Sequence, residues 1–218
     1  RGQPRQSKPV GKNLKNNKKQ EIVALVLAAG SSKRMGKDNK LLIDIDGSSL
    51  IRRTIGSLMA SNASAITVIT GHEADSVSAA LEDLSELTIV HNPHHNVGLS
   101  TSLKTGVAAL PETTDGVLIC LGDMPLVTPD IINALIQAFD PTEDRSICVP
   151  VFGRKRGNPI LWSRNFLTEM SKLSGDVGAR SLLEEHADQV HEVLMADDGV
   201  LFDVDTPEHL QRLKGRLS

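Results

Sequence analysis

Hydrophobic positions along the chain fall into two kinds of run, short β-branched runs and longer runs with helical spacing. A continuous apolar run of about four to eight residues is typical of a strand buried on both faces. Such runs predict strands at residues 22–27, 65–70, 87–91, 116–121 and 145–150. Helical patterns lie between them at residues 50–60, 74–81, 100–110 and 129–139. This alternation predicts an α/β fold with a mostly parallel sheet and helices on both faces.

The C-terminal third departs from this alternation. Residues 149–162 contain Gly153, Gly157 and Pro159, which indicates a ribbon or bent loop rather than another strand–helix–strand unit. Helices are expected near residues 164–172 and 179–186, followed by a strand at 190–194. A last helix is expected from Pro207 to about residue 213.

Length and composition favour one folded domain, because 218 residues with 39% hydrophobic and 23% charged side chains are typical of a soluble globular protein. Residues 1–20 are rich in Lys and Arg and contain no acid, so we expect a disordered basic tail or linker there and a folded domain at 21–218. Because the chain begins with Arg, the tail is also consistent with a linker to an upstream fused domain.

Composition also limits location and partners. The chain has one Trp, four Phe and no Tyr, which argues against stacking of single-stranded nucleic acid. No apolar stretch reaches the roughly 18 residues needed to span a bilayer. Cys120 and Cys148 both lie in apolar runs and are expected to be buried free thiols of a cytoplasmic protein. We therefore expect neither a nucleic-acid nor a membrane partner.

The segment L-A-A-G-S-S-K-R-M-G at residues 27–36 directly follows the first predicted strand. Ligands of open α/β sheets bind beyond the carboxyl ends of strands, and Gly30 allows the backbone to turn close to a ligand. The amides of residues 30–32 can form an anion-binding concavity, to which Arg34 and Lys40 add positive charge. The spacing excludes a Walker A loop and the dinucleotide fingerprint. A simple tight turn remains the alternative to a phosphate loop.

Two carboxylates stand at positions that favour a magnesium site. Asp123 follows the predicted strand 116–121, and Asp205 precedes the last predicted helix. Mg²⁺ is commonly held by one or two carboxylates together with phosphate oxygens and water. Asp205 is equally well placed to cap the helix. Asp203, two residues earlier, is a weaker candidate on the same side of an extended segment.

The phosphate-loop motif, followed by lysine, resembles that of the molybdenum cofactor nucleotidyltransferases, specifically the molybdopterin cytidylyltransferase branch of the MobA-like superfamily. Four further motifs match in order: L-G-D-M-P at 121–125, G-N-P at 157–159, G-D-V-G-A-R at 175–180 and D-V-D-T-P at 203–207. The resemblance covers residues 22 to about 213. It implies a Rossmann-like NTP transferase domain of the glycosyltransferase-A type.

The resemblance also assigns expected roles. It implies catalytic roles for Arg34, Lys40 and Asp123, and Mg²⁺ held by Asp123 and Asp205. Lys37 is nearer the loop than the family's lysine, but Asn39-Lys40-Leu41-Leu42 matches the family's continuation and favours Lys40. The expected nucleotide-binding residues are Leu27, Ala28, Ala29, Gly30, Ser31, Arg34, Lys40, Gly71, Gly98 and Ser100. The expected acceptor-binding residues are Asn158, Asp176 and Arg180.

The activity so implied is transfer of CMP from CTP to the phosphate of molybdopterin, with release of pyrophosphate. Ala29 favours CTP over GTP, because guanylyl relatives tend to carry a second glycine in the loop. A guanylyltransferase, a sugar- or polyol-phosphate nucleotidyltransferase, and a non-catalytic nucleotide-binding module remain open alternatives. A molybdenum hydroxylase is a further expected partner.

Overall fold

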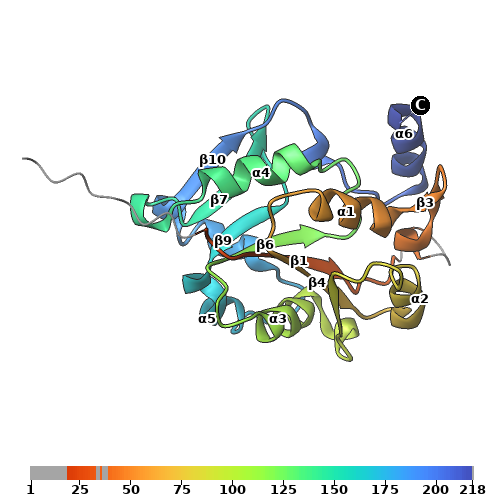
Figure 1. The fold of residues 1–218 in the computed structure, drawn as a ribbon, viewed down its shortest axis with the longest axis horizontal. Helices are drawn as coiled ribbons and strands as arrows, with labels where there is room; N and C mark the ends of the chain where they lie inside the picture. The colour runs from red at the N-terminus through yellow and green to blue at the C-terminus, as the bar shows by residue number, and fades with distance from the viewer. Residues whose placement is uncertain (1–18, 33–34, 36–38, 218) are drawn as a thin grey trace, which may run out of the picture.

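The computed structural model describes residues 19–32, 35 and 39–217, which contain one eight-stranded sheet and a short two-stranded ribbon (Figure 1). The strand order is β10-β7-β9-β6-β1-β4-β5, with β8 paired to β7. The strands of the large sheet are β1 (Ile22–Ala28), β4 (Ala65–Thr70), β5 (Leu87–His91), β6 (Gly116–Leu121), β7 (Ile147–Phe152), β8 (Lys155–Arg156), β9 (Ile160–Ser163) and β10 (Val190–Leu194). The ribbon pairs β2 (Asp44–Ile45) with β3 (Ser48–Ser49).

The sheet is mostly parallel, as the sequence predicts. β1 lies between β4 and β6 and pairs with both in parallel, and β5 extends this block beyond β4. β10 is parallel to β7, whereas β9 runs antiparallel to both β6 and β7. The ribbon expected at residues 149–162 exists as the β7–β8 hairpin, but the chain then re-enters the sheet as β9. The glycines and Pro159 that precede β9 hide this short, fully buried strand from a local sequence pattern.

Helices cover both faces of the sheet, as predicted (Figure 1). The α-helices are α1 (Leu50–Met59), α2 (Ala74–Ala79), α3 (Leu99–Ala109), α4 (Pro129–Ala138), α5 (Leu167–Met170) and α6 (Pro207–Leu217). Ala24 and Val26 of β1 share a buried cluster with side chains of α1 and α4. The intervening Leu25 packs with Leu103 of α3 on the other face. Such alternation places successive side chains of one buried strand against two different helical layers.

Helix boundaries follow local signals where those signals are strong. Thr128 caps α4 by accepting a hydrogen bond from the Ile131 amide, and Pro129 occupies the first turn. The helix expected at residues 179–186 is instead a 3-10 helix, Ala179–Leu183. Ala179 and Leu182 are both buried, and a 3-10 helix brings residues three apart onto one face. None of the described helices has the length and hydrophobicity needed to span a bilayer.

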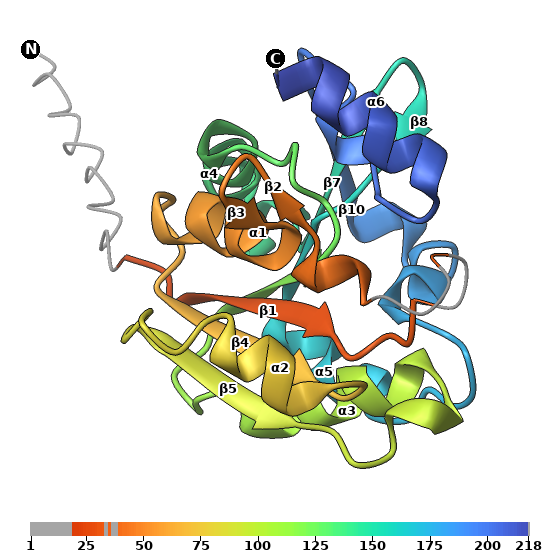
Figure 2. The same ribbon diagram turned by 90° about the vertical axis from the view of Figure 1, so that its right-hand side faces the viewer.

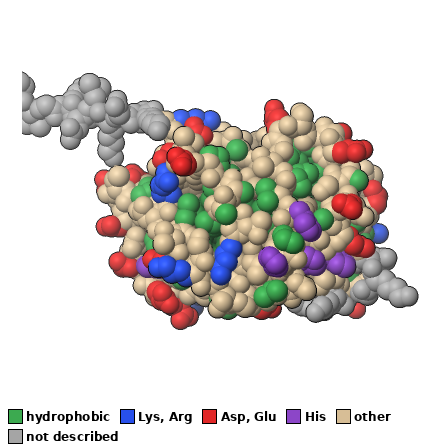
Figure 3. All heavy atoms as spheres, turned by 90° about the horizontal axis from the view of Figure 1, so that it is seen from below, with side chains coloured by type: hydrophobic (Ala, Val, Ile, Leu, Met, Phe, Trp, Pro, Cys, Tyr) green, Lys and Arg blue, Asp and Glu red, His purple; other side chains and the backbone are tan. Residues whose placement is uncertain are grey.

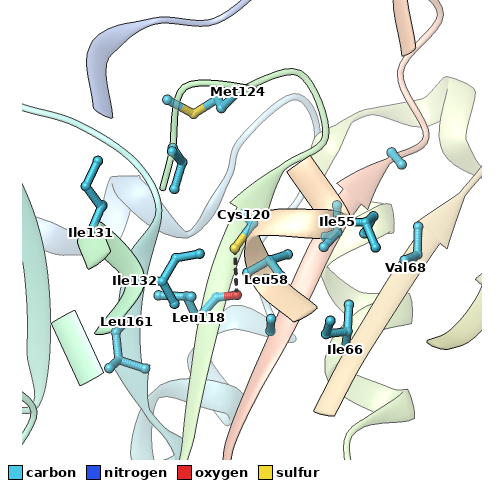
Figure 4. Close-up of a cluster of buried hydrophobic side chains, with 14 of the residues drawn as sticks. Ile55, Leu58, Ile66, Val68, Leu118, Cys120, Met124, Ile131, Ile132 and Leu161 are labelled. Atoms are coloured by element: carbon cyan, nitrogen blue, oxygen red, sulfur yellow. Dashed lines mark hydrogen bonds between the residues drawn. The ribbon is translucent and has the colours of Figure 1, made fainter. Parts of the chain in front are cut away.

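The larger cluster under α1 and α4 contains a cysteine (Figure 4). The thiol of Cys120 points among aliphatic side chains and donates to the Leu118 carbonyl, 3.5 Å away. Cys148 is also buried, and both thiols are free, as expected. Burial raises the pKa of Cys120 well above its usual range and that of Cys148 to about 12. Both thiols are therefore neutral core side chains.

A third cluster attaches the C-terminal helix. Leu213 of α6 is buried with Ile45 and Phe202, so the helix is tied to the two-stranded ribbon and to the segment that follows β10. Figure 2 shows α6 on the opposite side of β1 from α3. The segment 203–205, which leads into α6, thereby reaches the carboxyl end of β6, where Val204 donates its amide to the Asp123 carbonyl, 3.0 Å away.

Candidate active site

A cleft of about 730 Å³ opens at the carboxyl ends of β1 and β6. Its lining includes the end of β1 with the loop after it (residues 27–31), residues 40 and 41, the end of β6 with its turn (121–123), His72 after β4, the segment 95–99 at the start of α3, Ser102 and Asp176. This is the crevice where open α/β sheets bind ligands, and its volume lies within the range of about 300–1,000 Å³ typical of small-molecule sites.

The loop after β1 is held from both sides. Gly122 donates its amide to the Leu27 carbonyl at 3.1 Å, and His72 donates its amide to the Ala29 carbonyl at 3.2 Å. Gly71 has no room for a side chain, because an added Cβ would lie 2.5 Å from the His95 Cβ and 2.7 Å from the Ala29 Cβ. The close approach of these three backbones fixes the start of the predicted phosphate loop.

Lys40 is positioned by the end of that loop. Its amide donates to the Ser32 hydroxyl at 3.2 Å, and the Asn39 side chain caps the 3-10 turn Lys40–Leu42 by accepting from the Leu41 amide at 3.1 Å. The Lys40 ammonium forms ion pairs with both Asp123 and Asp205, the latter at 2.5 Å between Nζ and Oδ1. The sequence preference for Lys40 is consistent with this placement, whereas Lys37 lies outside the described residues.

Three aspartates converge around this ammonium. Asp123 follows β6, and the backbone pairing of Val204 with Asp123 brings Asp203 and Asp205 beside it. Carboxylate oxygens of the three aspartates all lie within 4.8 Å of one another. The Lys40 and Asp123 side chains are each only 13% exposed. Lys40 thus forms one largely buried charge cluster with residues 83 and 165 positions away in sequence.

Burial and charge shift two pKa values in this cluster. Burial raises the pKa of Asp123; the Lys40 ammonium opposes this shift, and the negative charges of Asp203 and Asp205 add to it. Burial lowers the pKa of Lys40, but Asp123 and Asp205 together outweigh it, so the pKa of the ammonium is raised. Lys40 therefore remains charged at neutral pH.

The cluster fits a hard divalent cation. Oδ1 of Asp123 is buried and has no hydrogen-bond partner among the described residues, so a strong acceptor is left for a ligand. The three carboxylates carry more negative charge than the single Lys40 ammonium offsets. An all-oxygen donor set suits Mg²⁺ or Mn²⁺ better than zinc. Asp123 and Asp205, with Asp203 beside them, are the residues that would hold such an ion.

Most of the sequence-predicted residues meet in this cleft. The lining includes Leu27, Ala28, Ala29, Gly30, Ser31, Lys40, Gly98, Asp123 and Asp176. Asp205 reaches it through Lys40, and Arg34 lies outside the described residues. The structure therefore gathers residues from four separate motifs, while their individual roles remain predictions.

Besides Asp205, four of the described predicted residues do not line the cleft. Gly71 lies behind its wall, and the Ser100 hydroxyl is turned inward, donating to the Gly175 carbonyl at 2.8 Å. Asn158 follows the β7–β8 hairpin, where its amide donates to the Val200 carbonyl at 2.9 Å. The Arg180 guanidinium donates to the Arg156 carbonyl at 2.6 Å. Their predicted roles in substrate binding therefore stay predictions.

Other lining residues were absent from the predicted set. His72 and His95 both border the cleft, with ring centroids 6.3 Å apart, and Val97 is 63% exposed beside them. Figure 3 shows several histidine side chains gathered near hydrophobic atoms on one face of the molecule. These residues follow β4 and β5, and ligands of open α/β sheets bind beyond the carboxyl ends of strands. Their position after two predicted strands was therefore the one sequence signal that could have placed them in the cleft.

The segment with Asp176 reaches the cleft through the N-terminus of α3. The Leu99 amide donates to the Asp176 carboxylate at 3.3 Å, and the Ser100 amide donates to the Gly175 carbonyl at 3.3 Å. Gly98 adopts a φ of 139°, and a Cβ there would lie 2.4 Å from the Gly175 carbonyl oxygen. The glycine thus permits the close packing of two loops that both contribute to the lining of the cleft.

Together, the strand order, the loop after β1 and the carboxylate cluster define an α/β protein of the nucleotidyltransferase class. A family model for the MobA-like NTP transferase domain matches residues 24–190. The chain belongs to the MobA-like NTP transferase family.

Individual relatives span nearly the whole folded part. The molybdenum cofactor cytidylyltransferase of Escherichia coli strain K12 is 27% identical over 197 residues, covering 89% of this chain and 96% of that protein. The nicotine blue oxidoreductase of Paenarthrobacter nicotinovorans is 26% identical over 197 residues, covering 88% and 96%. The manganese complex of Rv0371c from Mycobacterium tuberculosis H37Rv has a TM-score of 0.74 and 25% identity, covering 90% of this chain and 99% of that one.

Proposed function

We propose that this chain is a magnesium-dependent cytidylyltransferase, which transfers CMP from CTP to the terminal phosphate of molybdopterin and releases pyrophosphate. The observation that carries the proposal is the meeting of Lys40, Asp123 and Asp205 beside the loop of residues 27–31. The likeness to a molybdenum cofactor cytidylyltransferase over nearly its full length supports the choice of both substrates.

The reaction needs positioning and charge compensation more than a general base. The second pKa of a phosphate monoester is about 6, so the acceptor phosphate is largely an oxyanion at neutral pH. One of its oxygens attacks the α-phosphorus of CTP; the bond from that phosphorus to the β-phosphate bridging oxygen breaks, and pyrophosphate leaves. Holding the two reactants in line can lower the barrier by roughly 7–11 kcal/mol.

The residues of this chain would divide that work. Gly30, Ser31 and Lys40 line the cleft, where the two backbone amides and the Lys40 ammonium would face the polyphosphate and offset its negative charge. Asp123 and Asp205 would hold Mg²⁺, which neutralises phosphate charge when bound. Asp176 and the neighbouring segment 175–178 would border the acceptor.

Ala29 supports the choice of CTP. It lines the cleft, is only 5% exposed, and its methyl group packs toward Gly71 and His95. A glycine there would remove this methyl group and let the backbone of residue 29 move back toward Gly71, leaving more room for a purine in the cleft. Ala29→Gly should therefore raise the rate with GTP relative to CTP, while Ala28→Gly, one position earlier in the same loop, serves as the matched control.

The test is a matrix of nucleoside triphosphates and phosphorylated acceptors followed by pyrophosphate release. CTP with molybdopterin is expected to give the highest kcat/KM, and omission of divalent metal should abolish release. Highest turnover with GTP, or with a sugar or polyol phosphate, would replace the substrate assignment. If no pair gives pyrophosphate and the protein instead reduces nicotine blue, the proposal of nucleotidyl transfer is wrong. That result would favour an activity like the one for which the nicotine blue oxidoreductase is named.

A further inference from the structure

A second group of metal-ligating side chains lies outside the cleft, on the face of the sheet that carries α3 and α5. The His186 Nε2 atom is 2.7 Å from a Glu169 carboxylate oxygen. Glu185 is the third member, and one ligand atom from each of these residues lies within 4.8 Å of the others. None of the three lines the 730 Å³ cleft.

The imidazole is held in a defined orientation. Its ring meets that of Phe166 edge to face, with centroids 4.9 Å apart, and the His186 amide donates to the Leu182 carbonyl at 3.2 Å. Phe166 belongs to the buried cluster under α3, so this support is rigid. The Glu169 carboxylate holds Nε2 through the 2.7 Å contact, and a carboxylate oxygen of the exposed Glu185 lies within 4.8 Å of the ligand atoms of both residues.

We infer that Glu169, Glu185 and His186 form a binding site for a zinc-class divalent ion. An imidazole nitrogen and carboxylate oxygens are ligand types that Zn²⁺ accepts, and three protein ligands leave a fourth position for water. Mg²⁺ prefers oxygen ligands alone, so the imidazole distinguishes this site from the aspartate cluster beside Lys40. The partial exposure of both carboxylates gives the ion a path from solvent.

The position of the site suggests what a bound ion would do. Glu169 and His186 stand at the two ends of residues 170–185, whose middle carries Gly175 and Asp176. That middle part contacts Leu99 and Ser100 and forms one wall of the cleft. An ion joining the two ends closes the base of this loop, lowers its conformational freedom, and so stabilises the wall.

Zinc binding in the presence of saturating Mg²⁺ tests the site, because Mg²⁺ would then compete for the all-oxygen aspartate cluster, and the Asp123→Asn variant removes one of that cluster's ligands. Wild-type protein and the Asp123→Asn variant should each bind one Zn²⁺ at least tenfold more tightly than Glu169→Gln or His186→Asn. His191→Asn, which changes an exposed histidine of β10, should bind as wild type. Equal zinc affinity in wild type, Glu169→Gln and His186→Asn would overturn the site.

Glu169→Gln keeps the shape of its side chain and does not disturb the Phe166 contact, so it remains informative if His186→Asn folds poorly. The effect on the loop is measured by amide hydrogen exchange at Leu99 and Ser100. Zn²⁺ is expected to slow this exchange severalfold in wild type and leave it unchanged in Glu169→Gln. Zinc binding without slower exchange at these amides would overturn the link to the cleft wall. Neither measurement depends on the substrates of the cleft.

Discussion

The two walls of the cleft are built by different means. On one wall, the turn after β6 presents Asp123 and the 3-10 turn Lys40–Leu42 presents Lys40, and these two charged side chains are largely buried and paired. On the other wall, the segments 95–99 and 175–178 meet through hydrogen bonds at the N-terminus of α3. Hydrophobic side chains are exposed there, including Val97 and Leu99.

This difference separates chemistry from recognition. Groups that offset charge in a transition state must be preorganised, and strand ends within a packed sheet provide that rigidity. Loops that carry exposed apolar side chains can adapt to a particular base or acceptor. Substitutions on the sheet wall are therefore expected to lower kcat, and substitutions on the loop wall to raise KM.

The largest effect is expected from Asp123→Asn. Losing a preorganised charged group at the reacting centre costs roughly 3–4 kcal/mol, or about 10²–10³ in kcat. Pyrophosphate release under saturating substrates measures it, with Asp130→Asn in the exposed first turn of α4 as the control. A near-normal kcat in Asp123→Asn would show that this wall does not take part in the chemical step.

A smaller effect is expected from Gly98→Ala on the loop wall. The added Cβ would lie 2.4 Å from the Gly175 carbonyl oxygen, and the φ of 139° is strained for alanine. A strained backbone position costs on the order of 1–3 kcal/mol, measurable by denaturant unfolding, and KM for the acceptor should rise. Gly56→Ala, with nothing within 4 Å and a position inside α1, should instead stabilise by about 0.5–1 kcal/mol. Unchanged stability in Gly98→Ala would mean that the two loops separate readily.

Asp176→Ala should have a weaker effect on the same wall. It removes the acceptor of the Leu99 amide, a bond of 3.3 Å whose loss costs roughly 0.5–1.5 kcal/mol. KM for the acceptor should rise severalfold with little change in kcat, whereas the exposed Asp188→Ala should behave as wild type. A fall in kcat as large as that of Asp123→Asn would contradict the division between the walls.

The smallest effect concerns the core beneath the sheet wall. Burial raises the pKa of both thiols, so the reactive thiolate stays scarce as pH rises from 7 to 9 and increases only near the raised values. Folded protein at pH 8 should resist alkylation, while the unfolded chain should label at both Cys120 and Cys148. Mass spectrometry distinguishes the two, and rapid labelling of the folded protein would reveal local opening of this core.

The sequence predicted the sheet wall more completely than the loop wall. The apolar runs at β1 and β6 are continuous and are followed by glycine-containing turns, so the positions of these strands and of the residues after them could be inferred. β9 was missed because its four residues follow a glycine and a proline, and only pairing with β6 and β7 makes them a strand. A local pattern does not encode such long-range pairing.

The same limit applies to individual side chains. The hydrogen bond from the Val204 amide to the Asp123 carbonyl brings Asp205 beside Lys40. The sequence motifs predicted that Asp123 and Asp205 share a site, but they did not predict the ion pair between Asp205 and Lys40. Ser100 was predicted to bind the nucleotide, but its hydroxyl donates a hydrogen bond to the Gly175 carbonyl instead of facing the cleft. His95 was not among the predicted residues, because its place in the cleft depends on the missing side chain of Gly71.

The most direct test of the account is a crystal structure with CTP and Mg²⁺ bound. The prediction is that the ion binds to the carboxylates of Asp123 and Asp205, and that the triphosphate lies along residues 29–31 with Lys40 in contact. A nucleotide whose phosphates bind away from residues 29–31, or an ion remote from Asp123, would contradict the central claim.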